Sequence, residues 1–302
     1  MGNVPETPIY LQQPDGGPLP NASTSKLTRK SIEYNLTEHC NLSCYGCDHA
    51  SPLLPKKFAS LEAFSRDLQA LAQVFHSQQI RIVGGEPLLH PNLINFLSEA
   101  RRIGIADNIV LYTNGVLLHK APDALWKMID ELRISAYPGI QRKLDDGKCA
   151  EICSAHNVRL RINYIAEFEV ITINNRINDS ELVKAIYRDC KSRSEWSCHT
   201  VYGGRFYKCP VAAFTSARLG LRRVTFDNVA LDGVALHDNL NLYEELFQYL
   251  DAPTPLAACS YCLGSSGPSV VHRQLNNRSR SRWLEEDNRS DIEITRAQLL
   301  KQ

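Results

Sequence analysis

Between residues 31 and 164 the chain alternates two kinds of hydrophobic pattern. Short apolar runs predict β-strands; they occupy residues 32–36, 80–83, 109–112, 132–136 and 158–164. Between them, apolar residues recur every three or four positions, as they do on one face of a helix. The clearest such stripe begins after Ser60, a good helix N-cap, and consists of Leu61, Phe64, Leu68, Leu71 and Phe75. Five alternations predict an α/β fold with a parallel sheet and helical crossovers.

The pattern changes on both sides of this region. Residues 1–30 are rich in proline, glycine and glutamine and predict a flexible N-terminal arm. After residue 177 we expect a helix from Ser180, short strands and turns near residues 198–209, and a helix over residues 242–250. The end of the chain is polar and mixed in charge, which predicts a poorly ordered tail. The sequence therefore predicts an arm, two ordered domains and a tail, with the domain bounds 1–30, 31–177, 178–270 and 271–302.

The composition narrows the class of protein. The 302 residues carry a formal net charge of +1, so the chain lacks the concentrated positive charge that nucleic-acid binding requires. No apolar run is long enough to span a bilayer, and the N-terminus lacks a secretory apolar segment. We therefore expect a cytoplasmic protein with no nucleic-acid or membrane partner. Ten cysteines in that compartment indicate metal binding more than disulfides.

Three of these cysteines follow the first predicted strand in a C-x3-C-x2-C arrangement: Cys40, Cys44 and Cys47. Three thiolates at this spacing can hold three irons of a cubane [4Fe–4S] cluster and leave the fourth iron without a protein ligand. A zinc site or a disulfide is the alternative. Structural zinc sites close four ligands, commonly from paired C-x2-C units, so the triplet favours the cluster.

Two further loops follow later strands and should lie at the same edge of the sheet. Residues 84–87 read Gly-Gly-Glu-Pro, in which the glycines allow close backbone approach to a ligand and Glu86 offers a carboxylate to an ammonium group. Residues 113–115 read Thr-Asn-Gly. The alternative for the first of these loops is a tight turn with a surface glutamate.

The three motifs together resemble the radical S-adenosylmethionine (SAM) superfamily over residues 31–166. The resemblance implies a partial (β/α)6 barrel in which the triplet holds a [4Fe–4S] cluster. It also implies that SAM chelates the open iron and is reductively cleaved to a 5′-deoxyadenosyl radical that abstracts hydrogen from a substrate. The SAM-binding positions that it implies are Gly84, Gly85, Glu86, Thr113, Asn114 and Ser135.

A second set of cysteines resembles the short auxiliary-cluster extension, or twitch domain, of some members of this superfamily. The set consists of Cys198, Cys209, Cys259 and Cys262. The resemblance implies a small C-terminal domain with a second [4Fe–4S] cluster that moves electrons. A structural zinc ribbon is the alternative, because four cysteines satisfy it equally well.

Three cysteines remain, namely Cys149, Cys153 and Cys190. Free cysteines are usually small buried hydrophobes, and the alternative is that one of them donates a hydrogen atom to a substrate radical. Two further features point to a substrate cavity: His49 directly follows the cysteine loop, and Arg159 and Arg161 alternate with apolar residues in the fifth strand. The arginines grip a substrate carboxylate if they face the barrel, and otherwise form a solvated edge.

The sequence therefore predicts a radical SAM oxidoreductase or epimerase. We expect it to dehydrogenate or epimerise a small hydroxylated molecule of the sugar or aminocyclitol type in natural-product biosynthesis. The expected partner is an electron donor such as flavodoxin or ferredoxin. Two alternatives stay open: thioether or carbon–carbon crosslinking of a ribosomally made peptide, and a zinc-binding protein without enzymatic activity.

Overall fold

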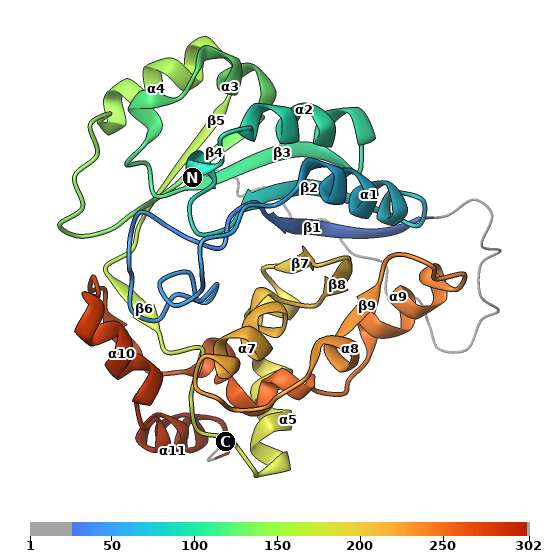
Figure 1. The fold of residues 1–302 in the computed structure, drawn as a ribbon, viewed down its shortest axis with the longest axis vertical. Coiled ribbons are helices and arrows are strands. Elements are labelled where there is room, and N and C mark those ends of the chain that lie inside the picture. Colours follow the sequence, from blue (N-terminus) through green and yellow to red (C-terminus); the bar gives the residue numbers. More distant parts are fainter. Residues whose placement is uncertain (1–25, 301–302) are drawn as a thin grey trace, which may run out of the picture.

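In the computed structural model, which describes residues 26–300, one curved sheet of eight strands forms the centre of the molecule (Figure 1). Its order is β5-β4-β3-β2-β1-β7-β8-β9. The strands are β1 (Leu27–Asn35), β2 (Phe75–Val83), β3 (Ala106–Thr113), β4 (Glu131–Ala136), β5 (Arg159–Tyr164), β7 (His199–Tyr202), β8 (Arg205–Tyr207) and β9 (Gly233–Ala235). Strands β1 to β5 and β7 are parallel, whereas β8 and β9 are antiparallel to their neighbours.

This topology confirms the predicted α/β fold with a mostly parallel sheet. The sixth parallel strand is β7, which pairs with β1 instead of extending the sheet beyond β5. After β5 the chain leaves the sheet, and β6 (Glu167–Glu169) pairs with β10 (Ser269–Val271) in a separate two-stranded sheet. The predicted boundary at residue 177 therefore separates two segments that share one continuous sheet.

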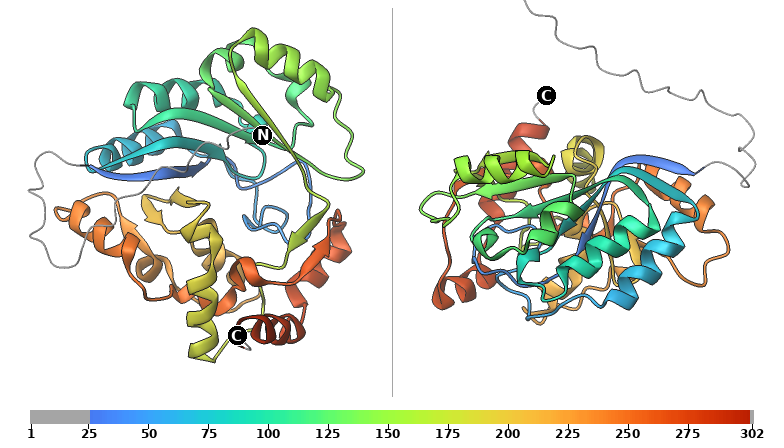
Figure 2. Two further views of the ribbon diagram at one scale, coloured as in Figure 1. Left: turned by 180° about the vertical axis from the view of Figure 1, so that it is seen from behind. Right: turned by 90° about the horizontal axis from the view of Figure 1, so that it is seen from above.

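Four helices cover one face of the sheet, as Figures 1 and 2 show, and connect its first five strands. They are α1 (Leu61–Ala72), α2 (Leu93–Ile103), α3 (Asp123–Met128) and α4 (Asp146–Ala155). The Ser60 side chain caps α1, as predicted, by accepting a bond from the Ala63 N–H, and α2 ends at Gly104 in the left-handed conformation.

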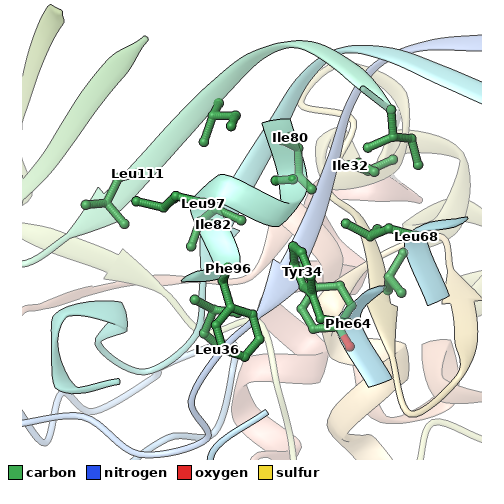
Figure 3. Packing of buried hydrophobic residues seen from close by; sticks show 14 of the residues in the cluster. Ile32, Tyr34, Leu36, Phe64, Leu68, Ile80, Ile82, Phe96, Leu97 and Leu111 are labelled. Carbon is green, nitrogen blue, oxygen red and sulfur yellow. The ribbon is translucent and has the colours of Figure 1, made fainter. Parts of the chain in front are cut away.

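The main hydrophobic core lies between these helices and the sheet (Figure 3). Phe64 and Leu68 of α1 pack against Tyr34 of β1, and Phe96 of α2 meets Phe64 edge to face with ring centroids 5.1 Å apart. Every helix turn contributes to one apolar face, which fixes the helices on this side and leaves the other side of the sheet for polar groups.

Most of the C-terminal half lies on that other side of the sheet (Figures 1 and 2), whereas helix α9 (Leu242–Asp251) contributes Leu242, Leu246 and Leu250 to the main core. Its helices are α5 (Ser180–Asp189), α6 (Lys191–Ser194), α7 (Pro210–Gly220), α8 (Val229–Asp232), α9 (Leu242–Asp251), α10 (Asn277–Glu285) and α11 (Arg289–Leu299). Short 3-10 helices occur at η1 (Pro87–Leu89), η2 (Leu118–Lys120), η3 (Ala257–Tyr261) and η4 (Gly264–Ser266).

The prediction of a poorly ordered tail from residue 271 is wrong. Trp283 of α10 and Ile292 of α11 are buried, and the Trp283 ring lies 5.4 Å from that of Tyr45 in the cysteine loop. The polar composition misled because two anchoring apolar residues are enough to dock these helices. Most of the predicted flexible arm lies outside the described residues, and Leu27 to Lys30 belong to β1. Within residues 26–300, no helix combines the length and apolar character needed to cross a membrane.

Candidate active site

The cysteine triplet lies in the loop that leaves the carboxyl end of β1. Cys40, Cys44 and Cys47 all line one cavity of about 830 Å³. Two N–H groups point at the Cys40 sulfur: the Leu42 amide lies 3.3 Å from Cys40 Sγ, and the Asn114 side-chain amide lies 3.5 Å from the same atom. Such donors stabilise thiolates that are bound to a metal cluster.

Burial governs the protonation of these thiols. Desolvation raises the pKa of Cys40 and of Cys47 to about 12. In the apo protein the thiols are therefore protonated at neutral pH, and a bound cation has to displace the protons. Over residues 26–300, no three His, Cys, Asp or Glu side chains gather tightly around a single metal-ion position. The thiolates of a cubane stand further apart than the ligands of one ion, because four irons lie between them.

A segment near the C-terminus, residues 272–275, runs along the cysteine loop, and we call it the strap. The Tyr45 N–H donates to the Arg273 carbonyl at 3.0 Å, and the Leu275 N–H donates to the Ser43 carbonyl at 2.7 Å. From the strap, Gln274 Nε2 donates to Cys44 Sγ at 3.2 Å. No sequence pattern predicts this contact, and the strap was expected to be part of the poorly ordered tail.

The Gly-Gly-Glu-Pro turn packs directly against the cysteine loop. Gly84 has φ +147°, and a Cβ there would lie 2.5 Å from the Thr37 carbonyl oxygen. A Cβ on Gly85 would lie 2.0 Å from the His39 carbonyl oxygen. Both glycines are therefore required for the two loops to touch, and both also line the cavity.

Glu86 braces this edge of the sheet. Its carboxylate is fully buried and accepts bonds from Thr113 Oγ1 (2.8 Å), the Asn114 N–H (2.8 Å) and the Leu88 N–H (3.0 Å). Burial raises its pKa to about 7, while these three donors act in the opposite direction. The expectation that the Glu86 carboxylate receives a ligand ammonium is not supported, because Glu86 does not line the cavity and its oxygens are already engaged.

The remaining positions implied for SAM do face the cavity. Thr113, Asn114 and Ser135 line it together with the two glycines. Their contacts with SAM stay predictions. His49 also lines the cavity, with Nδ1 2.8 Å from the Asp48 carboxylate.

Charged side chains of successive strands form the cavity wall on the sheet. Glu33 of β1 pairs with Arg81 of β2 at 3.0 Å. The Tyr112 ring of β3 then lies between Arg81 and Arg133, whose guanidinium carbons are 5.8 and 5.2 Å from its centroid. Arg133 also bonds Glu131, which lies beside it on the same face of β4. The wall is thus a continuous network of paired charges.

Most of this wall was missed by the sequence analysis. A signal for it exists, because three strands repeat the pattern apolar–Arg–Ile, at residues 80–82, 132–134 and 160–162. Of the two arginines that were considered in β5, Arg161 lines the cavity, whereas Arg159 does not. Both reach Glu131, at 3.3 and 3.4 Å for Arg159 and Arg161, and both side chains remain more than half exposed.

The second cysteine group differs from the predicted one by one member. Burial raises the pKa of Cys209, Cys259 and Cys262, and Cys190 adds electrostatically to the rise in each. Gly264 (φ +60°) lies close to the first and the last of these cysteines, Cys190 and Cys262. A Cβ there would lie 3.6 Å from Cys190 Cβ, and the Gly264 N–H lies 3.2 Å from Cys262 Sγ. The structure therefore gathers Cys190, Cys209, Cys259 and Cys262, which we call the second cysteine group.

Two buried cations accompany the second cysteine group. Lys208 is 1% exposed, and its ammonium donates to the Tyr187 hydroxyl at 2.6 Å. Arg218 is also buried and donates to the Ile173 carbonyl at 2.7 Å. Both interact electrostatically with thiols of the group. Cations beside the four thiols offset the negative charge that the thiolates acquire when they bind metal.

Cys198 lies apart from that group. It precedes β7, lines the large cavity, and has its sulfur 3.7 Å from a guanidinium nitrogen of Arg81. Cys149 and Cys153, by contrast, are buried in the main core behind the sheet and do not line the cavity. Of the three proposed hydrogen donors, Cys190 belongs to the second cysteine group and the other two are core residues, so the structure supports none of them.

Comparison with known proteins defines the class. Residues 34–142 match the model of the radical SAM superfamily. These residues thus form a radical SAM domain. This family uses a [4Fe–4S] cluster and SAM, and the expectation of these cofactors is confirmed at that level.

Several curated proteins are similar to part of the chain. A GTP 3′,8-cyclase of Petrotoga mobilis is 29% identical over 170 residues, which are 51% of this chain and 50% of that protein. A GTP 3′,8-cyclase of Desulforamulus reducens is 32% identical over 99 residues, or 32% of this chain and 30% of that protein. The chain spans half or less of the length of these relatives. Among solved structures, BtrN in complex with AdoMet and 2-DOIA matches with a TM-score of 0.49 and 18% identity, over 80% of this chain and 96% of that one.

Proposed function

We propose that this protein cleaves SAM reductively and uses the resulting radical to abstract hydrogen from a small hydroxylated substrate, of the sugar or aminocyclitol type. One observation carries the proposal. A single cavity collects the cysteine triplet, the glycine turn and a wall of hydrogen-bonding side chains. Radical precursor and substrate can therefore meet in one space.

Within this proposal, Cys40, Cys44 and Cys47 hold the [4Fe–4S] cluster, which supplies the electron for SAM cleavage when both are bound. The backbone at Gly84 and Gly85 and the side chains of Thr113, Asn114 and Ser135 bind and orient SAM. Glu86 holds the turn and the Thr-Asn-Gly loop in register, since it bonds both. The strap positions Cys44 from the opposite side.

The cavity favours a small and polar substrate. Its volume of about 830 Å³ lies in the range of small-ligand pockets, roughly 300–1,000 Å³. The cluster and SAM share that volume, which leaves room for a compact molecule and argues against an enclosed peptide. The charged lining residues balance: four are cationic, Lys30, Arg81, Arg133 and Arg161, and four are acidic, Glu33, Asp48, Glu167 and Glu169.

The balance of charges in the cavity also helps to judge whether this chain shares the activity of the relatives that are named GTP 3′,8-cyclases. Cyclisation of a nucleoside triphosphate is the second candidate function, because it is the activity in the printed names of the sequence relatives. A triphosphate binds best where cations exceed carboxylates. Since this wall pairs its arginines with glutamates, it suits hydroxyl and amino groups better than a triphosphate.

We further propose that the second cysteine group binds a second [4Fe–4S] cluster with all four irons ligated, and that this cluster carries electrons. Its four thiols and the neighbouring Lys208 and Arg218 support this assignment. A zinc ion in the same group is the alternative, and iron and zinc contents of the isolated protein separate the two. The external reductant is a one-electron donor such as flavodoxin or ferredoxin.

The test is anaerobic turnover. Protein reconstituted with iron and sulfide, reduced with dithionite and given SAM should release 5′-deoxyadenosine. Myo-inositol, glucosamine, 2-deoxystreptamine and GTP serve as probes, each added separately. We expect a hydroxylated probe without phosphate to increase the rate of release. Stimulation by GTP alone would overturn the proposed substrate class, and no 5′-deoxyadenosine from protein with an intact first cluster would overturn the proposed activity.

A further inference from the structure

Cys198 is the one cysteine that lines the large cavity without belonging to either cysteine group. It is carried by a short turn, residues 196–198, directly before β7. Since β7 pairs with β1, this turn lies beside the wall residue Glu33. The sulfur therefore faces the same space as the cysteine triplet, from the strand on the other side of β1.

The turn is held in an unfavourable conformation. Ser197 has φ +49°, in the left-handed region that residues with a side chain seldom adopt. Two hydrogen bonds from the sheet keep it there: Ser31 Oγ donates to the Ser197 carbonyl at 2.8 Å, and Arg81 donates to the Trp196 carbonyl at 2.9 Å. Backbone strain that surrounding hydrogen bonds maintain in this way is typical of positions whose geometry matters for function.

Arg81 supplies a second, independent sign that this corner of the cavity receives a ligand. Its side chain is 6% exposed and pairs with Glu33, but its Nε has no hydrogen-bond partner among the described residues. A buried guanidinium with an unused donor in a cavity wall is costly unless a ligand or water satisfies it. Cys198 thus lies beside a group that is prepared to hold a polar substrate.

The environment also keeps the Cys198 thiol protonated. Burial, followed by the negative charge of Glu33, raises the pKa of Cys198 well above its usual range, although Arg81 acts in the opposite direction. The sulfur keeps its hydrogen at neutral pH. An S–H bond is weaker than the C–H bond of a hydroxylated carbon, so this hydrogen can pass to a carbon radical.

We propose that Cys198 donates a hydrogen atom to the substrate radical in the cavity, which makes the reaction an epimerisation and not a dehydrogenation. The proposal rests on the proposed function of this site. In the step, the S–H bond breaks, a C–H bond forms, and a thiyl radical remains on Cys198. One electron from the one-electron donor and one proton from water restore the thiol, so each turnover consumes one SAM.

The experiment is turnover in deuterated water. Thiols exchange their hydrogen with solvent, so wild-type protein should place one carbon-bound deuterium in whichever of the four probes most stimulates 5′-deoxyadenosine release. Cys198→Ser keeps the size and polarity of the side chain but lacks the weak bond. We expect it to lower deuterium incorporation about tenfold or more, while the first turnover still yields 5′-deoxyadenosine. Cys153→Ala, at a cysteine outside the cavity, should incorporate deuterium like the wild type.

A second arm needs no substrate. In deuterated water, without added probe or thiol reagents, 5′-deoxyadenosine from the wild type should carry deuterium from Cys198, and that from Cys198→Ser several-fold less. Equal labelling of wild type and Cys198→Ser in either arm would overturn the proposal. An unlabelled, oxidised product from the wild type would also overturn it while leaving the proposed function intact. Failure of every probe refutes the proposed substrate class, and the second arm still decides the role of Cys198.

Discussion

The cysteine triplet and the second cysteine group each bring several thiols together, but the two sites are built differently. The triplet occupies eight consecutive residues of one loop, lines a large cavity and receives neutral N–H donors such as that of Gln274. The second cysteine group is assembled from segments up to 72 residues apart, from Cys190 to Cys262, and has the buried cations Lys208 and Arg218 beside it.

The difference indicates different tasks. Three thiolates at a cavity leave one iron free to bind a ligand, and neutral donors tune the cluster without blocking access. Four thiolates leave no open iron, and fixed cations stabilise the added negative charge in a site outside the large cavity. We therefore interpret the triplet as the site of SAM chemistry and the second cysteine group as an electron carrier.

The largest expected effect comes from removing the triplet. The variant Cys40→Ala, Cys44→Ala, Cys47→Ala should lose about half of the reconstituted iron and essentially all release of 5′-deoxyadenosine. Iron and sulfide analysis together with product chromatography measure both effects. Undiminished 5′-deoxyadenosine from this variant would break the assignment.

The second largest effect tests which cysteines belong to the second cysteine group. Cys190→Ala should lose the other half of the iron, about four atoms per chain, and keep SAM cleavage by the dithionite-reduced first cluster. Cys198→Ala, its matched control, should keep the full iron content. If Cys198→Ala lost this iron and Cys190→Ala kept it, Cys198 would be a cluster ligand and could not be the hydrogen donor in the cavity.

A moderate effect is expected at the anchor of the strap. Trp283→Ala removes a buried indole that packs on Tyr45, and should lower the free energy of unfolding by about 3 kcal/mol. Trp196→Ala, at a tryptophan that is 40% exposed, should change it much less. Thermal unfolding of the two holoproteins compares them; equal midpoints would show that α10 does not stabilise the cysteine loop.

The smallest effect concerns one hydrogen bond. Gln274→Leu removes the N–H that points at Cys44 Sγ, a contribution of about 1 kcal/mol, and should lower the reduction potential of the first cluster by roughly 40 mV. The second cluster should keep its potential, since the strap does not contact the second cysteine group. Redox titration followed by electron paramagnetic resonance distinguishes the two clusters.

Local patterns were sufficient to predict one half of this molecule. The triplet and the glycine turn are contiguous motifs, and the helical stripe after Ser60 and the apolar strands have the periods that set their burial. Each of these depends on neighbours in sequence, and the structure places them as expected.

Long-range packing decides the rest, and the sequence does not reveal it. Cys190 and Cys198 are eight residues apart and equally plausible as ligands, and only the pairing of β7 with β1 turns Cys198 toward the cavity. Glu86 resembled a ligand-binding carboxylate until its three donors became visible, two from the Thr-Asn-Gly loop and one from its own turn. The strap looked like a solvated tail because its anchor, Trp283, follows it in a strongly polar helix.

The measurement that tests the central claim most directly is electron paramagnetic resonance of the reduced, fully reconstituted protein with and without SAM. We predict two cluster signals, of which SAM changes only the one that disappears in the triplet variant. The signal that disappears in Cys190→Ala should remain unchanged. A single cluster signal, or a SAM-dependent change in the signal of the second cysteine group, would contradict the account.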